Sequence, residues 1–494
     1  MNTPLPVVDR VEVEPDPHGG VKIFADYTGD LEIDCDVLVV GSGPGGAVVA
    51  KELAEAGRDV VLLEEGPPFG KRDFTQEAGL SLHRTLREGG ARVARGTLFV
   101  PTMQAIALGG GSLINSAICA RSPAFVFDKW AERSGTRALT REVLDPHYDR
   151  VERFLNVGPT DEAIQGERNL RFKKGCDALG ISSGPTWRNV KGCKGSGECM
   201  TGCRNGAKQS TDVSYVPAAI RAGARVYTSV RAEHVTFDGR RATGMTGHVV
   251  TPFTNEEVHS FRARAKTVVL AAGCMATPVI LQRSGLSGKY LGAELQLHPG
   301  LAIMAVYEDV IDPWKGATQG YHSLHHIAEG MKFEVLWSPP AVLAARLPGL
   351  GHDYQKHLRD YKRMAPFDVI IATEHSSGTV KAKRKGWDPD LKFEFANDDM
   401  EVFQRGLGIL SDICWASGAI GILPGLHGVP ELLSTKAESD AFLRERRIVP
   451  RDTITAANHA FGSTRMSRKP EDGVVDERGR VHDKDNLYVA DTGV

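Results

Sequence analysis

CDVLVVGSGPGGAVVAKELAEAGRDVVLLEEG, residues 35–66, is the stretch of sequence that decides the fold. Its first part, DVLVV, is a short β-branched run of the kind found in buried parallel strands. The glycines of a G-x-G-x-x-G motif follow at Gly41, Gly43 and Gly46, before a helix of small residues and a second strand, DVVLLEE. This order of strand, turn, helix and strand predicts a dinucleotide-binding unit.

Each part of the turn has a physical role in that interpretation. Gly41 permits the tight turn, Gly43 lets a pyrophosphate approach the backbone, and Gly46 lets the helix pack closely on the strand. The helix N-terminus offers N–H groups to the phosphates, and Glu64 can accept hydrogen bonds from the adenosine ribose. The predicted cofactor contacts are Gly41, Ser42, Gly43, Pro44, Gly45, Gly46 and Glu64. A glycine-rich turn without a ligand is the alternative.

Two later segments indicate which dinucleotide is bound. KTVVLAAGCMATPVILQRSG, residues 266–285, reads as a strand, a turn and a helix, and DNLYVADTGV, residues 485–494, reads as a strand that ends in an acid. A simple NAD-binding unit is continuous in sequence, whereas strands near residues 36, 267 and 487 would form one discontinuous sheet. Such a sheet suits an elongated cofactor, and we therefore predict FAD, with a nicotinamide-dependent dehydrogenase as the weaker alternative.

Composition limits the remaining possibilities. A chain of 494 residues is too long for one compact core, and 41% hydrophobic and 25% charged residues are ordinary globular values. The formal net charge of −2 gives no sign of nucleic-acid binding. The first 20 residues lack a secretory signal pattern, and no apolar run is long enough to span a membrane. We expect a soluble, cytoplasmic protein.

Several further motifs, in this order, resemble those of the glucose–methanol–choline (GMC) oxidoreductases. They are LGGGSLINSAICAR (108–121), VVLAAGCMATPVILQRSG (268–285), QLHPG (296–300), NHAFGSTRM (458–466) and GVVDERGRVHDKDNLYVADTGV (473–494). The resemblance covers the chain from about residue 34 to its end. It implies an α/β fold, α+β when taken as a whole, in which a discontinuous Rossmann-like FAD-binding domain is joined to a substrate domain built on an antiparallel sheet.

The resemblance also implies domain boundaries. The FAD-binding domain is expected at residues 30–300, with a cysteine-loop insertion at about 150–215, and the substrate-binding domain at 301–455. Residues 456–494 are expected to return to the FAD-binding domain. Family members usually continue into a C-terminal helix with a second catalytic residue, and that helix is expected to be missing after Val494. A flavin-binding protein without turnover is therefore kept as an alternative.

The activity implied by the resemblance is oxidation of the CH–OH group of an alcohol, with hydride transfer to flavin N5. His459 occupies the place of the catalytic histidine of the family, and a neutral imidazole can take the hydroxyl proton as general base. Asn458 could orient the ring or a substrate oxygen. The enzyme would be an oxidase or a dehydrogenase, so its electron acceptor would be oxygen or a redox partner.

Further cofactor contacts are expected around the flavin and the adenine. The loop GGGSLIN contains Gly109 and four predicted contacts, and its glycines allow the backbone to approach a flat ring. Asn115 could bond the isoalloxazine edge. The resemblance also assigns a backbone contact with adenine to Ala232, and places Asp491 near the ribityl chain or the pyrophosphate. The four contacts in the loop are Gly110, Gly111, Ser112 and Asn115.

The loop GCKGSGECMTGCRNG, residues 192–206, contains Cys193, Cys199 and Cys203. A structural zinc site usually has four ligands, and a disulfide would be unusual in the cytoplasm. Some sugar dehydrogenase relatives carry an iron–sulfur cluster near this region, although with different cysteine spacing, and a three-iron cluster is one alternative here. We favour a glycine-rich loop with buried thiols and no metal.

The same loop is similar to that of a subgroup with cholesterol-oxidase-like enzymes and long-chain alcohol oxidases. It favours a bulky apolar alcohol over a free sugar as the substrate, whereas a cluster at the three cysteines would favour a sugar.

The region from 302 to 455 is less informative. A helical pattern covers residues 398–419, and FDVIIATEH (367–375) and LKFEFAND (391–398) read as strands. Four apolar residues are candidates for a substrate pocket, although the plain core is the favoured interpretation: Met331, Phe333, Trp337 and Phe461. The histidines of HSLHH are expected in a solvated loop rather than a metal site: His322, His325 and His326.

Overall fold

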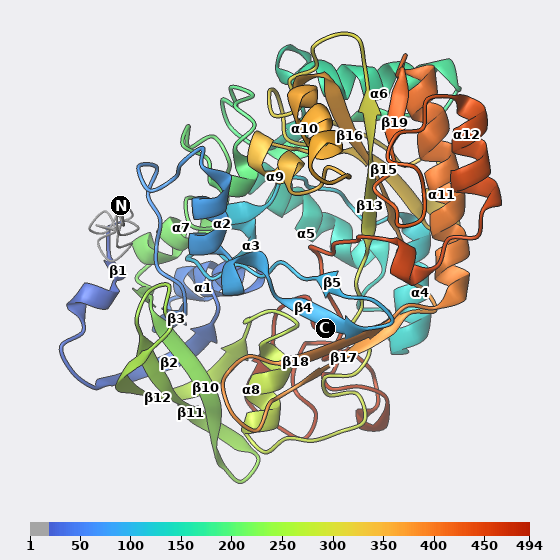
Figure 1. Ribbon diagram of the computed structural model, residues 1–494. Coiled ribbons are helices and arrows are strands. Elements are labelled where there is room, and N and C mark those ends of the chain that lie inside the picture. Colours follow the sequence, from blue (N-terminus) through green and yellow to red (C-terminus); the bar gives the residue numbers. More distant parts are fainter. Residues whose placement is uncertain (1–18) are drawn as a thin grey trace.

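The computed structural model describes residues 19–494, and two sheets dominate it (Figure 1). A mainly parallel sheet holds the glycine-rich turn, and an antiparallel sheet lies beside it, covered by long helices on one face. Residues 1–18 lie outside the described residues, and they include most of the N-terminal stretch that was expected to lack a secretory signal. The predicted fold class is confirmed.

Three distant segments form the centre of the parallel sheet. β12 (Glu257–Leu270) pairs in parallel with β2 (Leu31–Val40) and, at its C-terminal end, with β20 (Leu487–Val489). The prediction that strands near residues 36, 267 and 487 share one discontinuous sheet is therefore confirmed. The other strands of this sheet are β1 (Val21–Lys22), β3 (Val60–Leu63), β9 (Arg225–Tyr227), β10 (Val230–Asp238) and β11 (Arg241–Val250).

The glycine-rich turn connects β2 to α1 (Pro44–Glu55), and small residues decide how that helix packs. Ala47, Ala50 and Ala54 are buried against the sheet. The last four residues of β2 and all four of β3 are buried apolar side chains, as parallel strands covered on both faces require. α7 (Tyr215–Arg221) packs beside α1 on the same side.

The antiparallel sheet has six strands in the order β19-β13-β16-β15-β14-β7. The long helix α11 (Asn397–Ala416) packs on it together with α6 (Glu167–Ala178), and α11 confirms the helix expected at 398–419. The six strands are β7 (Gly184–Pro185), β13 (Gly300–Val306), β14 (Tyr321–Ser323), β15 (Met331–Val335), β16 (Met364–Ile371) and β19 (Gly421–Leu423).

The apolar face of β15 contains two of the four residues that were candidates for a substrate pocket. Met331 and Phe333 are fully buried and pack with α11 in the main hydrophobic cluster, so they belong to the core rather than to a substrate pocket. Trp337 is also buried, whereas Phe461 is 46% exposed. His322 lies on β14 and is half-buried, so its expected place in a solvated loop is wrong.

A smaller sheet joins the two halves of the molecule. β4 (Val93–Gly96) and β5 (Val100–Pro101) come from the first half, while β17 (Ser377–Lys381) and β18 (Asp390–Glu394) come from the second. β6 (Val157–Pro159) pairs with β8 (Trp187–Asn189). The other α-helices are α2 (Ala78–Thr85), α3 (Gly111–Ile114), α4 (Ala124–Ser134), α5 (Arg141–Phe154), α8 (Thr277–Arg283), α9 (Pro340–Ala344), α10 (His352–Arg359) and α12 (Lys436–Asp440).

The cysteine-loop insertion is shared between the two halves. Its β7 joins the antiparallel sheet, and its α6 packs against α11. The domain boundaries given above remain our proposal. No helix within residues 19–494 is long and apolar enough to cross a membrane. The cytoplasmic location stays a prediction.

Candidate functional site

The turn after β2 is built from glycines that cannot carry a side chain. Gly41 has a φ of +99°, and a Cβ on it would lie 2.3 Å from the carbonyl oxygen of Ala271. A Cβ on Gly45 would lie 1.8 Å from the carbonyl oxygen of Ala490, just beyond β20. These two glycines therefore let the turn approach the ends of both neighbouring strands.

Gly43 is different, because the space beside it is open. The nearest atom to a Cβ on Gly43 would be the Cα of Gly110, at 3.9 Å. No side chain within residues 19–494 caps the N-terminus of α1, and Pro44 occupies its first turn. The helix therefore presents uncapped N–H groups beside an open glycine, which is the arrangement that a pyrophosphate requires. The predicted residues fit a dinucleotide here.

Ser42 and Glu64 tie this turn to the second glycine loop. Both side chains are buried, and Glu64 Oε2 accepts hydrogen bonds from the Ser42 amide at 3.0 Å and the Ser42 hydroxyl at 2.6 Å. Glu64 Oε1 accepts from the Gly66 amide at 2.9 Å, and burial raises the pKa of the Glu64 carboxyl. The amide of Gly109 donates to Ser42 Oγ at 2.9 Å. The contact of Glu64 with a ribose stays a prediction.

The loop GGGSLIN packs directly against the first turn. Gly110 has a φ of +52°, and a Cβ on it would lie 2.7 Å from the Cα of Gly43. Ser112 donates to the carbonyl of Gly109 at 2.6 Å and accepts from the amide of Thr211 at 2.9 Å. The structure thus brings together the two glycine segments that the sequence singled out separately. Gly111 begins α3 and is exposed.

Thr211 is a site residue that sequence reasoning missed. Its hydroxyl lies 3.0 Å from the carbonyl of Ser42 and 3.1 Å from that of Gly109, so it links both glycine segments. Asn115 is half-buried, and its side-chain oxygen accepts from the amide of Ala117 at 3.0 Å. That hydrogen bond holds the shape of the loop, and its predicted bond to a flavin ring remains untested.

Ala232 and Asp491 lie on the other strands of the site. Ala232 is buried on β10, which begins beside Glu64, since the amide of Val230 donates to the carbonyl of Glu64 at 2.9 Å. Asp491 follows β20 and accepts from the Gly273 amide at 2.9 Å and the Thr277 hydroxyl at 2.5 Å. Burial raises the pKa of Asp491. This carboxyl therefore fixes the turn between β12 and α8.

His459 lies on a loop that is bonded to two parts of the site. The Phe461 and Gln296 backbones exchange two hydrogen bonds, and the Gly462 amide donates to the carbonyl of Thr492 at 2.8 Å. The loop is thereby held against the chain that carries Asp491. Asn458 and His459 are both exposed to solvent.

His298 packs against His459 and was not assigned a role from the sequence, although it belongs to the QLHPG motif. The two ring centroids are 4.5 Å apart at an angle of 85°. Although residue 459 is exposed at the surface, the protein packed around its imidazole, His298 included, desolvates the ring and lowers the pKa of His459. Burial, with His459 and Lys332 adding to it, lowers the pKa of His298 to about 3. Both imidazoles are therefore neutral at neutral pH, and a neutral His459 is the form that can accept a proton.

The three cysteines lie around one small cavity, and the expectation of a loop with buried thiols and no metal stays a prediction. They line a cavity of about 10 Å³, which holds about one water molecule. Arg188 Nη2 lies 3.0 Å from Cys199 Sγ. Lys208, buried beneath the loop, donates to the carbonyls of Cys199 at 2.7 Å and Asn115 at 3.0 Å. Cys199 is buried, whereas Cys193 and Cys203 are half-buried.

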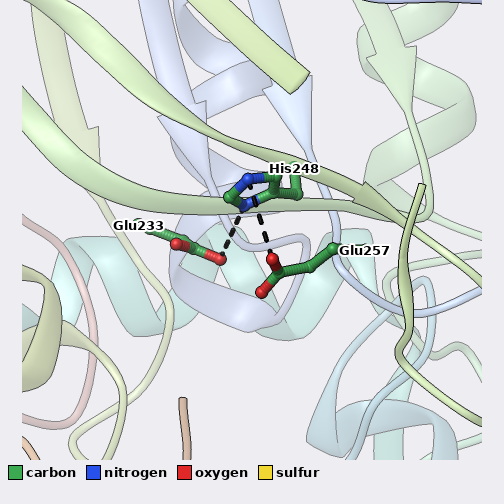
Figure 2. Close-up of side chains that lie close together, drawn as sticks. All are labelled: Glu233, His248 and Glu257. Carbon is green, nitrogen blue, oxygen red and sulfur yellow. Dashed lines mark hydrogen bonds and ion pairs between the residues drawn. The ribbon is translucent and has the colours of Figure 1, made fainter. Parts of the chain in front are cut away.

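One group of three potential metal ligands occurs within residues 19–494, namely Glu233, His248 and Glu257 (Figure 2). Arg231 already pairs with both carboxylates, and it donates to Glu233 Oε1 at 2.7 Å. Burial opposes ionisation of Glu233, but Arg231 and His248 together outweigh it and hold the pKa of that carboxyl below its usual value. Because Arg231 and His248 each face both carboxylates, we interpret this group as an ion-pair network on the sheet.

Sequence comparisons place most of the chain in one family. The family models described as GMC oxidoreductase match residues 82–300 and 374–494, and a model described as NAD(P)-binding Rossmann-like domain matches residues 39–97.

An uncharacterized GMC-type oxidoreductase of Mycobacterium tuberculosis is 30% identical, over 97% of this chain and 75% of its own length. A long-chain-alcohol oxidase of Arabidopsis thaliana is 26% identical, over 96% of this chain and 66% of its own length. The fold is similar to that of the pyridoxine 4-oxidase of Mesorbium loti, with a TM-score of 0.68 at 18% identity, covering 93% of this chain and 94% of that one.

Proposed function

The chain belongs to the GMC oxidoreductase family, and from that premise we propose that it oxidises the CH–OH group of an alcohol with His459 as the general base. Proteins of this family bind FAD, and relatives of this chain include a long-chain-alcohol oxidase and an oxygen-dependent choline dehydrogenase. The observation that carries the proposal is the position of His459 on a loop bonded to both the chain beside Asp491 and the backbone beside His298.

The residues that would hold FAD are those of the two glycine segments. Gly43 and Gly110 would face the pyrophosphate, with the N-terminus of α1 supplying N–H groups. Glu64 keeps capacity to accept ribose hydroxyls, because a carboxylate has about four lone-pair sites and three are used within the chain. Bound FAD supplies the acceptor for the hydride that leaves the alcohol carbon.

His459 handles the proton of the alcohol in this proposal. As the hydride leaves carbon, the hydroxyl oxygen must lose its proton, and a neutral imidazole nearby can accept it. Desolvation favours the neutral form of His459, which keeps it ready to accept. Asn458 lies next to it on the same exposed loop and would orient the substrate oxygen. The acceptor that reoxidises the cofactor would be oxygen or a redox partner.

His459→Ala tests the proposal. The variant should keep its flavin, while anaerobic reduction of the flavin by a reactive alcohol should slow by about 10²–10⁴-fold, the usual contribution of general base catalysis. The measurement is the loss of visible flavin absorbance after rapid mixing. His259→Ala is a matched control, since this histidine lies at the start of β12, at the end of the strand away from the glycine turn, and the variant should be reduced at the wild-type rate.

An unchanged reduction rate in His459→Ala would remove the assigned base. A wild-type protein whose bound flavin no alcohol reduces would contradict the proposed activity itself.

A further inference from the structure

The face of β15 opposite to α11 carries charged residues. Side chains alternate along a strand, so Met331, Phe333 and Val335 point to the helix while Lys332 and Glu334 point away from it. Glu334 is 4% exposed, so its carboxylate lies under protein atoms rather than on the molecular surface. A buried carboxylate requires partners, and its neighbours supply them.

The strand register places polar side chains from three neighbouring strands side by side. Glu334 lies directly opposite His322 on β14 and Asp368 on β16. Directly opposite residues of antiparallel strands point to the same face, so the three side chains form one line. Lys332 Nζ and Gln319 Nε2 each lie 2.5 Å from Glu334. We name this group the polar row: Gln319, His322, Lys332, Glu334 and Asp368.

The polar row is next to the histidine pair. A Cβ on Gly300 would lie 2.7 Å from Asp368 Oδ2, and the amide of Gly300 donates to the carbonyl of Ala456, three residues before His459. Lys332 also acts electrostatically on both His298 and His459. A substrate whose hydroxyl reaches His459 would therefore have the polar row beside it.

Three buried atoms in this region have no hydrogen-bond partner among residues 19–494: Asp368 Oδ1, His322 Nδ1 and His298 Nε2. Buried polar atoms in folded proteins are usually paired with protein groups, water or a ligand, so these three atoms leave hydrogen-bonding capacity for a bound polar group. Burial, with Glu334 adding to it, raises the pKa of Asp368 to about 8. At neutral pH its carboxyl is thus mainly protonated and can donate as well as accept.

We propose that the polar row binds the additional hydroxyl groups of a polyhydroxylated alcohol, such as a sugar or a polyol, while His459 acts on the reacting hydroxyl. The inference rests on the proposed function and specifies its substrate class. Hydroxyl groups donate and accept at once, so they can satisfy Asp368, His322 and Lys332 together. An alkyl chain would leave Asp368 Oδ1 and His322 Nδ1 without a hydrogen-bond partner and desolvated, which disfavours the bulky apolar alcohol suggested by the cysteine loop.

The test compares two classes of alcohol as anaerobic reductants of the flavin. Glucose, sorbitol and 1-decanol are mixed with the wild-type holoenzyme, and the dissociation constant and limiting reduction rate are obtained from the concentration dependence. We expect glucose or sorbitol to saturate the rate at lower concentration than 1-decanol. Lys332→Met should weaken polyol binding by about 10-fold or more, as loss of a charged hydrogen bond does, with little change in the limiting rate.

The control is Lys392→Met, which removes an exposed lysine from β18 and should leave both constants unchanged. Asp368→Ala is the second variant. It removes both side-chain oxygens and should also weaken polyol binding without affecting 1-decanol.

A lower dissociation constant for 1-decanol than for either polyol in the wild type would overturn the inference and leave the proposed function intact. Unchanged polyol binding in both variants would overturn it as well. Reduction by none of the three alcohols would overturn the inference together with the proposed function.

Discussion

At the scale of single residues, the glycines of the first turn matter because they have no side chain. Gly41 and Gly45 lie against backbone carbonyls, whereas Gly43 lies beside open space. The three glycines therefore have different roles. Gly41 and Gly45 let the turn pack closely against neighbouring backbone, and Gly43 leaves room for a ligand. Substitutions at these positions should separate folding from cofactor binding.

Gly43→Val should abolish FAD binding, because the added side chain would fill the space that the pyrophosphate needs. The purified variant should lack visible flavin absorbance while keeping the circular dichroism of the wild type. Gly288→Val, at an exposed position with open space around it and no left-handed φ, is the control and should keep its flavin. Stoichiometric flavin in Gly43→Val would show that the turn had been misinterpreted.

The pH dependence of catalysis follows from the histidine pair. His459 must be neutral to accept the proton, and desolvation lowers its pKa below the usual value of about 6.5. The anaerobic flavin-reduction rate should therefore be flat at neutral pH and fall only as the pH drops through that lowered pKa. His298, with a pKa of about 3, should add no step in this range. A rate that still rises above pH 7 would contradict this assignment.

At the scale of elements, the side chains of β15 alternate between its two faces, and those on one face contribute to stability while those on the other belong to the proposed substrate site. Its apolar side chains meet α11, and its charged side chains form part of the polar row. Changes on the helix side should thus alter the free energy of unfolding without altering substrate binding. The same period of two was present in the sequence MKFEV, where polar residues occupy every second place.

Phe403→Ala tests that separation. Phe403 is fully buried on α11, so its loss should destabilise the protein by about 3–5 kcal/mol. A lowered midpoint of thermal unfolding, with unchanged affinity for the substrate, is the expected result. Glu401→Ala, on the exposed side of the same helix, should change stability by no more than about 0.5 kcal/mol. A matching loss of substrate affinity in Phe403→Ala would contradict the separation.

At the scale of the whole molecule, the sequence was informative where local patterns coincide with long-range structure. The β-branched runs around residues 37, 268 and 487 identified strands that meet in one sheet, because buried parallel strands have a composition of their own. The glycine segments were identifiable for a similar reason. Their approach to one another was not, since it rests on contacts between distant parts of the chain, including the link made by Thr211.

Other features lacked any local signal. His322 was expected in a loop, and its strand β14 has only three residues, too few to show alternation in the sequence. Its position opposite Glu334 becomes visible only with the strand register. The contact of His298 with His459 joins residues 161 positions apart, through backbone pairing that no single-sequence pattern encodes. The substrate side of the site was consequently the least predictable part.

The place of β12 between β2 and β20 has a consequence for biosynthesis. When a ribosome has completed β2 and β12, the edge that β20 will cover still has no partner, because residues 487–489 are translated more than 200 residues later. Sheets that depend on such distant pairing form slowly, and their open edges invite association with other chains. Nascent chains of this protein should therefore rely on chaperones until residues 487–489 have been synthesised.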